Sequence, residues 1–224
     1  MTARGASFSL PRRTSVRRNL AHGWQLEPTP LPVANFIRQA VRAVPFAMAK
    51  RLGRCRIALA SLEADQTSTW SATETALEIS VAAETASPHD VALELLTCLG
   101  QTLWYRLTAA ERALYWRLLE AEIREGISGE IDESALEAKQ RILADRARSP
   151  ERLEQYAQAS FAATAAEYVH SMWHDVRVRQ GSDHLPARHL RRRLSLLARW
   201  FPPNPGYRLF PAAPARRLPS SRVK

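Results

Sequence analysis

A capped apolar segment in the middle of the chain constrains the fold most. Ser87 can cap a helix, Pro88 suits the first helical position, and Asp90 can close a capping box with Ser87. The apolar side chains that follow recur at helical spacing: Val91, Leu95, Leu96, Leu99, Leu103 and Leu107. So wide an apolar face must be covered, so we expect a buried helix over 88–107 with other elements packed around it.

The segments before this helix predict a small sheet. Residues 55–62, 68–72 and 76–82 have the short, alternating or fully apolar patterns of strands, with a polar turn between the last two. An earlier helical pattern in 36–53 is interrupted by Pro45, which breaks or kinks a helix.

The segments after it predict more helices. A capping box, Thr108 with Glu111, opens a helix that reaches about residue 125. Three further helical patterns follow, over about 132–147, 149–179 and 186–200. The fold class is therefore α+β and mostly helical, with a small sheet before the central helix.

The expected organisation has four parts. Residues 1–31 read as a disordered basic arm, and 32–180 as the helical domain with its small sheet. Residues 181–201 read as a basic amphipathic helix. Residues 202–224 contain six prolines and read as a disordered Pro/Arg-rich tail.

Residues 97–104, TCLGQTLW, resemble the zinc-binding helix of gluzincin-type bacterial metallopeptidases, which has the frame HELGHALW. The resemblance implies a zincin-like fold, with the small sheet just before the active-site-type helix. It also implies that Thr97, Cys98 and Gln101 occupy the positions of the two ligand histidines and the general-base glutamate. Neutral threonine and glutamine side chains compete poorly with water for zinc.

A second segment, residues 160–166 (SFAATAA), is similar to the EFFAEAF pattern that carries the third zinc ligand in the lethal-factor-like group. The resemblance implies that Ser160 replaces the ligand glutamate and Thr164 the supporting one, with Glu167 as a rival for the ligand position. These replacements predict a catalytically inactive zincin-like protein with a binding or structural role and no cofactor. The alternative is an unrelated mixed fold whose buried helix never held zinc.

Other candidate chemistry is sparse. Cys98 has no basic neighbour in the sequence that would activate a thiol. Glu167, His170 and His174 lie at i, i+3 and i+7 on one helical face, so an atypical metallopeptidase with displaced ligands is a second alternative. The simpler interpretation is a polar helix face with two surface histidines and no metal.

The net charge of +10 is concentrated at the two ends. Residues 1–26 carry +5 and 177–224 carry +11, which leaves −6 on the rest. Such ends can attract nucleic acid without sequence preference, an anionic membrane or an acidic protein partner. The simpler interpretation is that they are solvated tails that keep the chain in solution. The candidate contacts are the arginines of the last predicted helix: Arg188, Arg191, Arg192, Arg193 and Arg199.

The apolar runs and the cysteine content of the sequence indicate the cellular compartment. It has no apolar run of about 18 residues, so no membrane span is expected. Two cysteines, Cys55 and Cys98, suit a reducing compartment. A cytoplasmic location is therefore expected.

Overall fold

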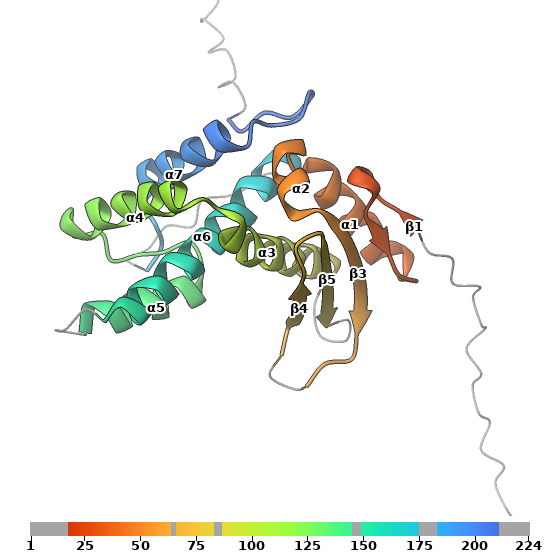
Figure 1. Cartoon of the computed structure of the whole chain (residues 1–224), viewed down its shortest axis with the longest axis horizontal. Helices are drawn as coiled ribbons and strands as arrows, with labels where there is room; N and C mark the ends of the chain where they lie inside the picture. The colour runs from red at the N-terminus through yellow and green to blue at the C-terminus, as the bar shows by residue number, and fades with distance from the viewer. Residues whose placement is uncertain (1–17, 64–65, 83–86, 145–148, 175–182, 211–224) are drawn as a thin grey trace, which may run out of the picture.

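The computed structural model describes residues 18–63, 66–82, 87–144, 149–174 and 183–210. Within them the chain forms a five-stranded mixed sheet and seven α-helices. Figure 1 shows the sheet with α1 (Leu31–Ala43) and α2 (Phe46–Leu52) at one side of the molecule. Helices α4 (Ala109–Arg124), α5 (Glu133–Ala144) and α7 (Ala187–Trp200) lie at the other side. Helices α3 (Pro88–Arg106) and α6 (Pro150–Trp173) run between the two groups. The predicted α+β, mostly helical class is confirmed.

The sheet has the strand order β1-β2-β3-β5-β4. Its strands are β1 (Arg18–Asn19), β2 (Gln25–Leu26), β3 (Arg54–Ala60), β4 (Ser68–Ala72) and β5 (Ala76–Ala82). Strand β5 pairs in parallel with β3 and antiparallel with the edge strand β4. The last three strands agree with the predicted 55–62, 68–72 and 76–82 to within two residues. They form because alternate β5 side chains, Leu77, Ile79 and Val81, are buried.

Helix α3 (Pro88–Arg106) begins as the sequence predicts. Ser87 and Asp90 form the capping box, and Pro88 occupies the first turn. Its buried residues include Val91, Leu95 and Leu99. Helix α4 (Ala109–Arg124) starts with the second predicted capping box, between Thr108 and Glu111. Local capping chemistry therefore sets both helix starts.

The remaining helices are α5 (Glu133–Ala144), α6 (Pro150–Trp173) and α7 (Ala187–Trp200). Helices α3 and α6 pack closely against each other at Gly100. A Cβ atom at this position would lie 2.7 Å from the Ala162 carbonyl oxygen and 3.1 Å from the Ala165 Cβ. Glycine on α3 and the alanine-rich middle of α6 thus allow the two backbones to touch. This contact fixes which ends of α3 and α6 meet.

Two segments expected to be disordered are ordered in part. Residues 18–31 add β1 and β2 to the sheet and bury Trp24 and Leu26, because these apolar side chains dock on the core. Residues 202–210 also pack on the body: the Asn204 side chain accepts a hydrogen bond from the Phe46 backbone N–H and donates to the Val44 carbonyl. Residues 1–17 and 211–224 lie outside the described residues.

Helix α7 belongs to the same hydrophobic core as the rest of the chain. Leu194, Leu196 and Leu197 are buried in it, and Tyr168 of α6 donates a hydrogen bond to the Phe201 carbonyl at 2.5 Å. Among the helices of the described residues, none is both long and apolar enough to cross a membrane.

Candidate metal centre

The positions on α3 that resemble a zinc motif are engaged in structural contacts. The Gln101 side-chain oxygen accepts a hydrogen bond from the Trp70 indole on β4, at 2.8 Å. The Thr97 hydroxyl donates back to the Leu93 carbonyl of its own helix, at 3.2 Å. Gln101 therefore holds the edge strand against α3, and Thr97 caps a backbone oxygen.

Cys98 is fully buried, and burial raises the pKa of its thiol to about 11. At neutral pH the side chain is therefore the protonated thiol, which is a poor nucleophile. Cys98 thus contributes to the packing of the core.

Ser160 and Thr164 of α6 lie in a different environment from Gln101. The Tyr115 hydroxyl from α4 contacts the Ser160 Oγ at 3.1 Å and the Thr164 Oγ1 at 2.8 Å. Ser160 also accepts a hydrogen bond from the Arg193 guanidinium at 2.8 Å. Within the described residues, Gln101 and Ser160 therefore have different hydrogen-bond partners.

A buried ion network surrounds Ser160. We define it as two carboxylates and two cations: Glu122, Glu130, Lys139 and Arg193. Arg193 contacts Glu122 at 2.6 Å and Glu130 at 2.7 Å, and Lys139 contacts Glu130 at 3.2 Å. Burial opposes ionisation of Glu130, but the attraction of Arg193 and Lys139 outweighs it and lowers the pKa of Glu130 to about 2.

This network corrects the prediction that Arg193 contacts nucleic acid or a partner. Its side chain is fully buried and pairs with two carboxylates. The sequence placed it in a run of three arginines, and only its position toward α4 separates it from the two exposed neighbours. The other predicted contacts are exposed, and we call them the basic edge: Arg188, Arg191, Arg192 and Arg199.

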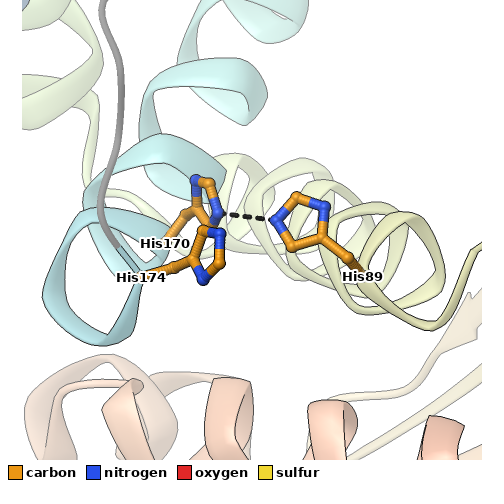
Figure 2. A group of neighbouring side chains, drawn as sticks. All are labelled: His89, His170 and His174. Carbon is orange, nitrogen blue, oxygen red and sulfur yellow. Dashed lines mark hydrogen bonds between the residues drawn. The ribbon is translucent and has the colours of Figure 1, made fainter.

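The strongest candidate site lies where α3 begins and α6 ends. His89, in the first turn of α3, faces His170, in the last turn of α6, and their Nε2 atoms are 2.9 Å apart. His174 follows α6 and adds a third imidazole, and Figure 2 shows the three rings gathered at one point. One potential ligand atom from each residue lies within 4.8 Å of the others. We call these three residues the histidine cluster.

The spacing of the histidine cluster fits one metal ion after small side-chain rotations. In a tetrahedral site with metal–nitrogen bonds of about 2.0–2.1 Å, ligand atoms lie roughly 3.3 Å apart. The His89–His170 distance of 2.9 Å is slightly shorter than this, and the 4.8 Å limit for the whole cluster is longer. His170 is buried, His89 is half-buried and His174 is exposed, so one side of the cluster reaches solvent.

Two carboxylates flank the far edges of the facing rings. Glu167 Oε2 lies 3.4 Å from His170 Nδ1, and Asp90 Oδ1 lies 3.5 Å from His89 Nδ1. Carboxylates in this position orient metal-binding histidines by accepting the Nδ1 hydrogen, which leaves Nε2 free for the metal. Glu167, predicted as a possible ligand, is therefore placed to support His170 instead.

Proton accounting favours a cation between the facing rings. A neutral imidazole carries only one N–H. In a direct Nε2···Nε2 hydrogen bond, the ring that donates has its proton on Nε2. Its unprotonated Nδ1 then faces a carboxylate with a lone pair. Either a shared extra proton or a metal ion between the rings removes the repulsion between this Nδ1 lone pair and the carboxylate. A single proton serves only the 2.9 Å His89–His170 pair, whereas a metal ion also uses His174.

The sequence indicated two members of the histidine cluster but missed His89. Glu167, His170 and His174 were grouped because they are close in the chain, while His89 is 81 residues from His170. His170 is also buried, which corrects its reading as a surface histidine. The signal that finds His89 is the antiparallel packing of α3 on α6, which brings the start of one helix to the end of the other.

Comparison of the chain with protein-family models, with curated proteins and with solved structures finds no match.

Proposed function

We propose that this protein binds a divalent first-row transition metal, with zinc as the test ion, through His89, His170 and His174. The observation that carries the proposal is the meeting of three imidazoles whose two inner rings each have a carboxylate at Nδ1. Imidazole nitrogen is a preferred ligand for zinc, copper and nickel.

The role of the metal is structural or binding, on a scaffold without zinc-peptidase chemistry at α3. The contacts of Thr97, Cys98 and Gln101 support this part of the proposal, because none of them leaves a ligand or base available. A zincin-like origin for the scaffold remains a prediction from residues 97–104. The metal would fasten the start of α3 to the end of α6, at the opposite end of α3 from Trp104.

Metal analysis and calorimetry test the proposal. The purified full-length chain is stripped with a chelator and titrated with Zn²⁺, and we expect one ion per chain. His89→Ala, His170→Ala and His174→Ala should each weaken binding by at least about tenfold, since even loss of a supporting residue costs 10–100-fold. His184→Ala, which changes a histidine outside the cluster, is the matched control. Unchanged zinc affinity in the variant lacking all three cluster histidines would overturn the proposal.

The basic edge is the second candidate, as a non-specific contact for nucleic acid or an acidic protein partner. The observation in its favour is that its four arginines are exposed while α7 contains no acidic residue. Glu125 partly offsets this charge, since it lies 3.9 Å from Arg188 and 3.5 Å from Arg192.

A further inference from the structure

The indole ring of Trp173 lies beside all three histidines of the cluster, and the proposed metal binding assigns it no role. Its ring centroid lies 6.2 Å from His89, 5.6 Å from His170 and 5.5 Å from His174. The Trp173 Nε1 atom is buried and has no hydrogen-bond partner among the described residues. A buried N–H without an acceptor is destabilising, so the position of this group beside the cluster needs a reason.

The histidine cluster also lacks a fourth ligand among the described residues. The group of side chains with converging ligand atoms contains only the three histidines. Asp90 and Glu167 lie at the Nδ1 edges of His89 and His170, away from the facing Nε2 atoms. Zinc sites with three protein ligands keep the fourth position for water or substrate, whereas structural sites are closed by four protein ligands.

We propose that the metal at the histidine cluster keeps one coordination position for an exogenous anionic oxygen ligand, and that the Trp173 indole N–H donates a hydrogen bond to it. This inference rests on the proposed metal binding and adds the ligand class, a small oxyanion such as a carboxylate. The exposed side of the cluster, at His174, gives such a ligand access. An oxygen bound there supplies both the missing fourth ligand and the missing acceptor for Nε1.

The charge of the site limits the charge that the ligand can carry. A divalent ion held by three neutral imidazoles is balanced by Asp90 and Glu167, so the site has little excess charge to hold a polyanion. A monoanion gains one metal–oxygen bond and one hydrogen bond. The aromatic edge of Phe36, whose centroid is 6.2 Å from both His89 and Trp173, adds an apolar boundary.

Cobalt substitution separates this inference from the proposed function. The chelator-treated chain is loaded with Co²⁺, whose visible absorption reports its coordination, and is then titrated with acetate. We expect Co²⁺ to bind and acetate to change the spectrum in a saturable way. Failure of Co²⁺ and Zn²⁺ to bind overturns both proposals, whereas bound Co²⁺ with a spectrum insensitive to acetate overturns only the open position.

The role of Trp173 is tested with Trp173→Phe, which keeps an aromatic ring and removes the N–H. We expect about tenfold weaker acetate binding, because a hydrogen bond to a charged acceptor is lost, with Co²⁺ affinity within about twofold of wild type. Trp200→Phe, at the far end of α7, is the matched control and should change neither value. Equal acetate affinity in wild type and Trp173→Phe would remove Trp173 from the site.

Discussion

Helix α6 carries two polar clusters that differ in how completely their groups are paired. Near its middle, Ser160 joins the buried ion network, where every cation contacts a carboxylate and no member is exposed. At its end, the histidine cluster brings together three groups of the same kind and reaches solvent through His174. The first arrangement is complete without a ligand, and the second becomes complete when a cation is added.

Because of this difference, we expect changes in the buried ion network to lower the stability of the fold, and changes in the histidine cluster to weaken metal binding. Removing one member of a closed network leaves a buried charge, which is strongly unfavourable. Removing a member of an open cluster costs little to the apo fold and much to the ligand. The following predictions test that contrast, starting with the largest effect.

Arg193→Met should be the most destabilising change. It leaves Glu122 and Glu130 buried with Lys139 as the one remaining cation of the network, beside the His189 imidazole 3.7 Å from Glu122. The free energy of unfolding should therefore fall by about 3–5 kcal/mol in urea denaturation. Arg192→Met, on the exposed neighbour, should change it by less than about 0.5 kcal/mol. A loss below about 1 kcal/mol for Arg193→Met would mean that the network is not closed as described.

Glu167→Gln should weaken metal binding with little effect on the apo protein. It replaces the carboxylate that accepts from His170 Nδ1, and loss of such a supporting group lowers metal affinity about 10–100-fold. Zinc calorimetry measures the affinity, and thermal melting without metal measures the fold. Glu151→Gln, at the exposed start of α6, is the control; equal losses in both variants would place Glu167 outside the site.

The Arg51–Glu111 ion pair is intermediate in burial between the buried ion network and an exposed surface pair. It is half-buried and is joined by two hydrogen bonds of 2.8 and 2.7 Å. The hydrogen bond from Arg51 is the main cause that lowers the pKa of Glu111 to about 2. Because the folded-state pKa lies below the unfolded value of about 4.3, this stabilisation is present above pH 4.3 and lost as pH falls toward 2.

Glu111→Gln keeps the capping box, since glutamine also serves there, and removes the charge. We expect a loss of about 1 kcal/mol at pH 7, after allowance for solvent screening, that disappears near pH 2. Thermal melts of both proteins between pH 2 and 7 measure the difference. Glu137→Gln, which breaks an exposed pair with Arg141, should show a smaller difference at pH 7. A gap that persists at pH 2 would contradict the assignment.

The basic edge should show the smallest effect. Because α7 supplies buried core residues, its charge is changed by substitution rather than by deletion. Arg191→Gln with Arg199→Gln should weaken binding of single-stranded nucleic acid modestly and reduce its salt dependence by about one to two released counterions. Arg106→Gln with Arg124→Gln is the control of equal charge. Binding that does not respond to salt in the wild type would remove this candidate.

The sequence by itself determined the local features of the chain. Helix starts at Ser87 and Thr108, the break at Pro45 and the strand alternation in 76–82 follow from interactions a few residues apart, and all of them are confirmed. The tertiary structure decided what depends on distant contacts. Arg193 became a buried ion because Glu122 of α4, Glu130 and Ser160 of α6 contact it, although Arg191 and Arg192 beside it in the chain are exposed.

The histidine cluster shows the same division most clearly. The sequence places His170 and His174 together because helical spacing is a local property. It indicates only a helix start at residues 87–90, where His89 lies. The close α3–α6 packing at Gly100 set the alignment of the two helices and brought His89 to His170. A site shared by two helix ends depends on that alignment, which no short-range pattern encodes.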